Sequence, residues 1–162
     1  MRVKSLIALS LLLTASNAVL ADSSERDLKC LALNVYHEAR GEPLEGQLAV
    51  AMVTMNRVYS KSYPDTVCGV VWQRRQFSWT HDGRSDRPRD QQSWKVAKQI
   101  SEYVYNKYDK HRDLSGGALD LTKGALHYYA PKHANPNWAN YKEVTSKIGG
   151  HIFLKGRKNN RS

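Results

Sequence analysis

The stretch "NVYHEARGEPLEGQ", residues 34–47, marks where one predicted helix ends and the next begins. Before this break, apolar residues recur at the spacing of one helical face: Leu28, Leu31, Ala32, Val35, Tyr36 and Ala39. An S-x-x-D signal places the start of this helix at Ser24. Gly41 and Pro43 predict that the helix ends near Arg40.

Glu38 falls in the last turn of that helix. The negative end of the helix dipole disfavours a charged carboxylate there, and burial would add to this effect. Both raise the pKa of a carboxyl group toward the range that a general acid needs. Glu42 has a simpler interpretation, as a partner of Arg40 or a cap for the next segment, and Glu45 as a partner of the next helix dipole. Glu38 is therefore the candidate catalytic carboxylate, with an ordinary helix-end charge as the alternative.

Further helical segments are predicted after the break. Residues 48–55 are apolar nearly all round apart from Thr54, which predicts a buried central helix. A short helix or turn begins near Pro64, and residues 91–108 form an amphipathic helix. Residues 74–90 are polar and contain Gly and Pro, which predicts a long loop of the kind that is often functional or mobile.

The last third of the chain has a different pattern. "GALHYYAP", residues 124–131, and "GHIFLKG", residues 150–156, are short, aromatic or β-branched, and bounded by Gly or Pro, so they predict strands. Strand alternation places one of Tyr128 and Tyr129 inside and the other outside. Residues 135–150 are expected to join the two strands as a loop. The predicted class is α+β, mainly helical, with a small antiparallel sheet near the C-terminus.

The N-terminal residues predict a secretory signal peptide over residues 1–21. Arg2 and Lys4 precede an apolar run, which ends in "SNAVLA" with cleavage expected after Ala21. The alternative is a membrane anchor, but the run is shorter than the about 20 apolar residues that a span needs. We expect export to the periplasm, the cell envelope or the outside. A single domain is then expected over residues 22–155, followed by a flexible basic tail at 156–162.

Two cysteines, Cys30 and Cys68, are present in the chain. In an exported protein such a pair can close as a disulfide, which is the arrangement we expect. Two separate free thiols are the alternative, because the sequence does not establish that their Cβ atoms lie close enough.

The chain has a formal net charge of +10, spread along its length. Such a charge suits a polyanionic partner, and it does not distinguish nucleic acid, anionic lipid and acidic cell-wall polymers. Aromatic and polar residues interleave in residues 72–83 and 127–131. Sugar rings stack on side chains of this kind while polar groups bind their edges, and nucleobases can stack in the same way.

Other kinds of catalytic site find less support. His37 and Glu38 begin like the zinc motif H-E-x-x-H, but Gly41 stands where the second histidine is needed. The spacing of His127, His133 and His151 matches no metal motif, and no G-x-S-x-G sequence occurs. We therefore expect neither a catalytic metal nor a cofactor. Carboxylate chemistry on a glycosidic bond remains, with Glu38 as the acid.

Four segments, in this order, resemble the SleB/CwlJ-type cell wall hydrolases, which include the spore-cortex-lytic enzymes: "LALNVYHEARGEPLEGQLAVAMVTMNRV", "YPDTVCGVVWQRRQFSW", "GALHYYAP" and "IGGHIFLKG". The resemblance runs from about Leu31 to about Phe153, and the E-A-R-G-E-P-x-x-G-Q segment is its most specific part. It implies a lysozyme-like fold and an active site for peptidoglycan. It also implies Glu38 as the catalytic glutamate, and a glycan cleft lined by Gln76, Phe77, Ser78, Tyr128 and Tyr129.

The resemblance further implies a lytic transglycosylase. In that reaction Glu38 protonates the bond between N-acetylmuramic acid and N-acetylglucosamine, then accepts a proton from the muramic C6 hydroxyl as a 1,6-anhydro sugar forms. One carboxylate suffices. A hydrolytic muramidase would need a second one, which Asp82 or Asp86 could supply.

The expected partners are peptidoglycan glycan strands and, through the basic surface, anionic wall polymers; we expect a monomer. Spore members of the family that this chain resembles often carry a separate wall-binding domain, and none is visible in this sequence. The rival functions are a catalytically silent wall-binding module and an exported nuclease or nucleic-acid-binding protein. Nucleic acid is not the expected partner, because no metal motif accompanies the charge.

Overall fold

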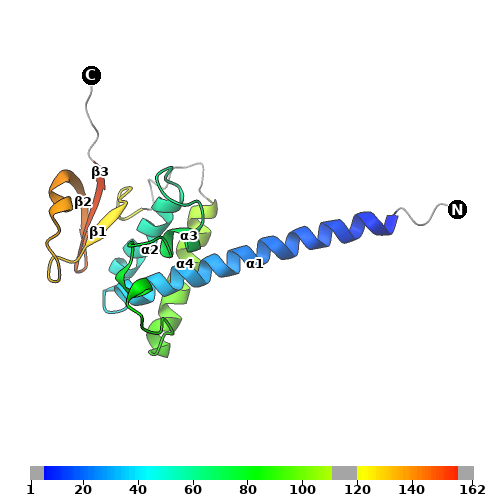
Figure 1. The fold of residues 1–162 in the computed structure, drawn as a ribbon, viewed down its shortest axis with the longest axis horizontal. Helices are drawn as coiled ribbons and strands as arrows, with labels where there is room; N and C mark the ends of the chain where they lie inside the picture. The colour runs from blue at the N-terminus through cyan, green and yellow to red at the C-terminus, as the bar shows by residue number, and fades with distance from the viewer. Residues whose placement is uncertain (1–5, 111–119, 157–162) are drawn as a thin grey trace, which may run out of the picture.

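A computed structural model describes the backbone of residues 6–110 and 120–156, and the side chains of residues 22–108 and 120–156. Apart from Gly156, the expected basic tail lies outside the described residues, as do the first five residues of the expected signal peptide. The helices and strands are α1 (Leu6–Ala39), α2 (Leu44–Val58), α3 (Val67–Val71), the 3-10 helix η1 (Ser78–His81), α4 (Gln91–Lys110), β1 (His127–Tyr129), the 3-10 helix η3 (Asn137–Tyr141), β2 (Lys142–Ile148) and β3 (His151–Gly156) (Figure 1).

Helix α1 is unbroken from Leu6 to Ala39, so the predicted start at Ser24 is wrong. No glycine or proline occurs between these ends, and nothing in the sequence interrupts the helix at Ser24. The predicted end near Arg40 is confirmed, with the Glu42 amide donating to the Ala39 carbonyl at 2.9 Å. The N-terminal half of α1 extends away from the rest of the molecule (Figure 1).

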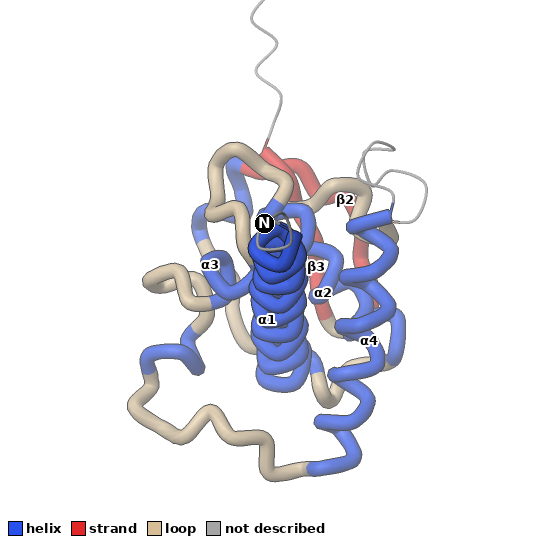
Figure 2. Tube along the Cα trace, turned by 90° about the vertical axis from the view of Figure 1, so that its right-hand side faces the viewer, coloured by secondary structure: helices blue, strands red, loops and turns tan. Residues whose placement is uncertain are grey.

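The helices form one lobe around α2. Helices α1, α3 and α4 each pack against α2, and α1 also packs against α3 and α4. Figure 2 shows α1 end-on with α3 and α4 on opposite sides. The middle of α2 is buried, as its apolar sequence predicted. Buried Thr54 fits this environment because its hydroxyl donates to the Val50 carbonyl at 3.3 Å and accepts from Asn34 Nδ2 at 3.0 Å. No helix within the described residues is long and apolar enough to cross a membrane.

The second lobe is a three-stranded antiparallel sheet in the order β1-β3-β2. Strand β3 is central, with Tyr128 opposite Phe153 on one side and Val144 opposite Leu154 on the other. Phe153 is fully buried and packs with Ala49 and Val53 of α2, which docks the sheet onto the helical lobe. The α+β class is confirmed.

Strand β2 lies where a loop was expected, so that part of the prediction is wrong. None of the residues of its sequence, "KEVTSKI", is fully buried, because β2 is an edge strand paired on one side only. A half-exposed edge strand carries too few apolar residues to show the alternation on which the strand prediction rests.

The disulfide between Cys30 of α1 and Cys68 of α3 is present in the structure, with a sequence separation of 38 residues. Next to it, the Cys68 amide donates to Asp27 Oδ1 at 2.9 Å. Asp27 therefore serves the first turn of α3 rather than the start of its own helix. The Thr66 hydroxyl completes that turn by accepting from the Gly69 amide at 3.1 Å.

Removing both sulfur atoms should destabilise the helical lobe. For a loop of this length, we expect the double variant Cys30→Ala, Cys68→Ala to lose about 3–4 kcal/mol of unfolding free energy. Urea denaturation of the variant and of the wild type, with and without reductant, measures this loss. Reductant should lower the midpoint of the wild type and leave that of the variant unchanged. An equal response of both proteins to reductant would show that the bridge does not stabilise the fold.

Candidate active site

Glu38 lies in the last turn of α1, with its side chain mostly buried. The Tyr128 hydroxyl, from β1, donates to Glu38 Oε2 at 3.2 Å. Burial raises the pKa of the Glu38 carboxyl, while the hydrogen bond from Tyr128 and the positive charge of Arg57 lower it by less. The direction of this shift is the one expected from the sequence, and burial is its main cause. A carboxyl group with a raised pKa keeps its proton to higher pH than an ordinary carboxyl does, as a general acid requires.

Tyr128 is suited to remain a hydrogen-bond donor. Burial and the neighbouring Glu38 carboxylate raise the pKa of its hydroxyl well above the usual value, so the hydroxyl stays protonated. Its ring is fixed by the His151 and Phe153 rings, at centroid distances of 5.4 and 5.8 Å. The neighbouring Tyr129 has a different ring partner, Trp138, at 5.9 Å. The two tyrosines thus have different ring partners, but both are half-buried, so the prediction of one inside and one outside is wrong.

His37 ties the long loop to the end of α1. Its Nε2 atom is 3.0 Å from the backbone carbonyl of Asp86. A carbonyl only accepts, so Nε2 must carry the proton in this contact. The His37 ring also stacks on Trp79, with 4.4 Å between centroids. The loop that follows Phe77 is therefore held beside Glu38 through a backbone atom, and not through the Asp86 carboxylate.

The remaining predicted site residues divide into two groups. Phe77 is buried in the helical core, so its predicted direct contact with a glycan is not supported, because no face of the ring is open. Gln76 is half-buried, and Ser78 and Tyr129 keep surface to contact a ligand. Asp82 is exposed and accepts from the Arg84 amide at 2.9 Å. Within the described residues, no hydrogen bond or ion pair joins Asp82 or Asp86 to Glu38.

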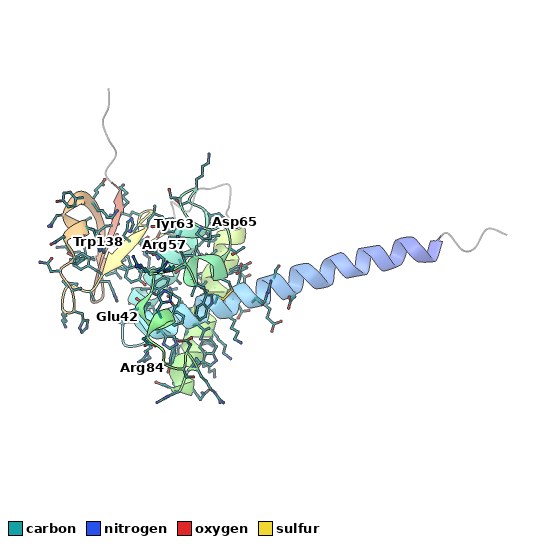
Figure 3. The ribbon with its side chains drawn as sticks, in the orientation of Figure 1. Glu42, Arg57, Tyr63, Asp65, Arg84 and Trp138 are labelled. Carbon is teal, nitrogen blue, oxygen red and sulfur yellow. A yellow bond between two sulfur atoms is a disulfide. The ribbon has the colours of Figure 1, made fainter. Side chains whose placement is uncertain are left out.

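Glu42 has a role that the sequence did not reveal. Its Oε2 atom accepts from the Gly150 amide at 2.6 Å and lies 3.8 Å from His151 Nδ1. Arg40, its expected partner, instead donates to the Tyr36 carbonyl at 3.3 Å and lies over the Tyr36 ring. Glu42 therefore connects the turn after α1 to the turn between β2 and β3, and Figure 3 shows it on the side of the helical lobe next to the sheet.

Sequence reasoning also missed Arg57, in the last turn of α2. This side chain is 5% exposed, and its Nε atom donates to the Leu126 carbonyl at 2.8 Å. The signal was an arginine that closely follows the apolar run of residues 48–55, which was expected to be buried. As for metals, no group of three or more His, Cys, Asp or Glu side chains in residues 22–108 and 120–156 could hold a metal ion.

The fold and the site define the class: an α+β protein of lysozyme-like architecture with a mostly buried glutamate, Glu38, at a helix end. The chain belongs to the cell wall hydrolase family, which it matches over residues 41–154. It is 38% identical over 135 residues to a spore cortex-lytic enzyme from Oceanobacillus iheyensis, covering 82% of this chain and 42% of that protein. It is 36% identical over 132 residues to the spore cortex-lytic enzyme of Bacillus cereus, covering 82% and 45%. The chain thus spans less than half the length of these relatives.

Two solved structures have the same fold. The catalytic domain of the Bacillus cereus SleB protein superposes with a TM-score of 0.63 and 36% identity, covering 81% of this chain and 91% of that one. The catalytic domain of the germination-specific lytic transglycosylase SleB from Bacillus anthracis gives 0.62 and 36%, covering 80% and 93%. Glu38 lies just before the family match at residue 41, but a match to 82% of the chain necessarily includes it.

Neutralising Glu38 should stabilise the protein at neutral pH. The folded-state pKa of Glu38 lies above its unfolded value of about 4.5, so wild-type stability falls as pH rises from 4.5 through the folded pKa. Glu38→Gln removes this titration and keeps an acceptor for Tyr128. We expect a gain in unfolding free energy at pH 7 that disappears below pH 4.5. Urea unfolding at several pH values measures it, with exposed Glu102→Gln as the control. A gain that is the same at every pH would contradict the assignment.

The contact of Glu42 with the β2–β3 turn can be tested at Gly149. Gly149 and Gly124 both have positive φ, of 56° and 78°, but only a Cβ atom at Gly149 would collide with the Glu42 carboxylate. We expect Gly124→Ala to cost about 1–2 kcal/mol from backbone strain, and Gly149→Ala to cost about 1–3 kcal/mol more.

The excess at Gly149 should disappear in a Glu42→Ala background, which a double-mutant cycle of unfolding free energies would show. Equal costs at Gly149 and Gly124 in the wild-type background would mean that Glu42 does not hold this turn.

Proposed function

We propose that this chain cleaves peptidoglycan as a lytic transglycosylase, with Glu38 as its general acid and base. The observation that carries the proposal is the mostly buried carboxyl of Glu38, whose pKa is raised and which accepts a hydrogen bond from Tyr128. Membership of the cell wall hydrolase family supports the substrate class, and the similarity to a structure described as a lytic transglycosylase supports the reaction type.

The reaction needs one group that first gives and then takes a proton. Protonated Glu38 donates to the glycosidic oxygen between N-acetylmuramic acid and N-acetylglucosamine, and the bond from that oxygen to the muramic C1 breaks. The leaving sugar departs with a hydroxyl. The Glu38 carboxylate then accepts the proton of the muramic C6 hydroxyl while its oxygen bonds to C1. The product is a 1,6-anhydro sugar, no water is consumed, and Glu38 ends protonated as it began.

The side chains around Glu38 suit both its protonated and its ionised form. Tyr128 keeps its proton throughout, so its hydroxyl can stabilise the carboxylate after the first transfer. Hydrolysis with Asp82 or Asp86 as a second carboxylate is the alternative reaction. It finds less support, because the described contacts of Asp82 and of the Asp86 carbonyl hold the loop itself. A catalytically silent wall-binding module is the alternative function.

Export also belongs to the proposal. The expected cleavage after Ala21 falls within α1, whose N-terminal half extends beyond the other elements (Figure 1), and it would leave the segment that carries Cys30 and Glu38 in place. The disulfide suits an oxidising compartment. Glycan strands are then the partner, anionic wall polymers would bind through the net charge of +10, and the protein would act as a monomer.

The proposed reaction predicts a defined set of products. Purified peptidoglycan digested with wild type should release muropeptides that end in 1,6-anhydro-muramic acid, detected by mass spectrometry. Glu38→Gln should lower the rate by at least about 10²-fold, because general acid–base catalysis supplies about 10²–10⁴-fold.

The carboxylates of the long loop provide the control. Asp82→Asn and Asp86→Asn should release the same anhydro products at nearly the wild-type rate. Reducing ends without anhydro sugars would change the reaction to hydrolysis. Absence of any fragment from folded protein on several wall types would favour the silent binding module.

A further inference from the structure

Arg57 is a buried cation without an anionic partner in direct contact. It is 5% exposed, and the ion pairs among the described residues do not include it. Its Nε atom donates to the Leu126 carbonyl, but its Nη1 atom is buried and has no hydrogen-bond partner in the structure. A buried guanidinium with an unused donor is unfavourable unless its charge serves another group.

Two aromatic rings replace water around this charge. Arg57 Cζ lies 5.3 Å from the centroid of Tyr63 and 5.4 Å from that of Phe77, both within cation–π range. Figure 3 shows Arg57 and Tyr63 close together. The rings attract the charge but accept no hydrogen bond in the plane of the guanidinium. They therefore keep water out without neutralising the charge, and its field extends further than that of an exposed arginine.

The field of Arg57 reaches the candidate active site. Arg57 Nε donates a hydrogen bond to the Leu126 carbonyl, two residues before Tyr128 in the chain. The Tyr128 hydroxyl in turn donates to Glu38. Its charge lowers the pKa of Glu38 and of Tyr128 and contributes to lowering that of His127 to about 4. At neutral pH Tyr128 and His127 are both uncharged, so Glu38 is the group among these three that can become the anion.

Other charged groups occupy the elements around Glu38, and they do not take this role. The titratable or charged groups are His37 and Arg40 near the end of α1, Glu42 in the following turn, Asp86 in the long loop, His127 and Tyr128 on β1, which are uncharged at neutral pH, and His151 on β3. Arg40 is exposed and turned onto Tyr36. His151 lies beside Glu42, and burial lowers its pKa, so it supplies little positive charge.

We propose that Arg57 is the buried counter-charge of the Glu38 carboxylate, a positioning residue that acts on the reaction without touching substrate. This inference rests on the proposed function. Burial alone favours the protonated acid and would make the carboxylate hard to reach after the first proton transfer. The guanidinium, held by Leu126 and by the two rings, stabilises that carboxylate until it accepts the next proton. Phe77 thereby contributes to the site as a wall for Arg57.

The direct test measures the ionisation of Glu38 without any turnover. The full chain, with glutamate labelled with ¹³C at the side-chain carboxyl, is titrated by NMR, and the Glu38 signal is assigned by its loss in Glu38→Gln. Arg57→Met should raise the measured pKa of Glu38, Arg57→Lys should restore most of the wild-type value, and exposed Arg40→Gln should leave it unchanged. An unchanged Glu38 pKa in folded Arg57→Met would overturn the inference.

A measurement on the wild type covers the case in which Arg57→Met does not fold. The ¹⁵N resonance of Arg57 Nε should titrate with the same midpoint as the Glu38 carboxyl, and an Arg57 resonance that ignores this midpoint overturns the inference.

Kinetics then separate the inference from the proposed function. On peptidoglycan, Arg57→Met should lower kcat on the order of tenfold and move the alkaline limb of kcat/KM to higher pH, and Arg57→Lys should recover both. A purely structural role would lower activity without moving that limb. If the wild type releases no fragments but the Glu38 pKa still responds to Arg57, the proposed function fails and the counter-charge remains. If fragments are released and the pKa does not respond, only the counter-charge fails.

Discussion

The hydroxyl of Tyr128 connects the sheet to the carboxylate at the end of α1, and most of the fold serves to bring these two groups together. Tyr128 is the middle residue of a three-residue strand, and a strand this short is not stable without its neighbours. It is placed by pairing with β3, and β3 is placed by the burial of Phe153 against α2. Burial of one such ring contributes about 1.5–3 kcal/mol. Glu42 also helps to place β3, because it accepts a hydrogen bond from Gly150, directly before the first residue of that strand.

The chemistry of Glu38 follows from a balance between burial and compensation. Removing the carboxyl from water favours the acid form, and one phenol donor and one buried guanidinium favour the anion. Because burial has the larger effect, the acid form of Glu38 persists to higher pH than is usual for a glutamate. Tyr128 and Arg57 still stabilise the anion enough for it to form. A group that must both release and accept a proton needs this kind of balance. A deeper site without the cation would trap the proton, and an exposed site would lose it too early.

The sequence predicted the parts of this structure that depend on local pattern. The end of α1 was predictable because Gly41 and Pro43 lie next to each other in the chain, and the buried α2 because its apolar residues are continuous. Glu38 could be singled out because its place in the last turn of α1 follows from the same nearby Gly41 and Pro43. The partners of Glu42 and Arg57 could not be predicted, because Gly150 and Leu126 are distant in the chain and meet them only through tertiary packing. Phe77 was misassigned since an aromatic residue in a polar segment has the same pattern whether it stacks on a sugar or on a buried arginine.

The continuity of α1 has a consequence for maturation of the protein. In the uncut chain, Ser24 and the acidic residues Asp22 and Glu25 lie within a helix, where their preference for helix starts has no effect. Cutting after Ala21, as proposed, would turn this inner segment into a new helix N-terminus. Acidic side chains would then meet the positive end of the shortened helix dipole, and a serine would be available to cap it. Loss of the leader would therefore leave a helix that already carries the residues suited to its new first turn.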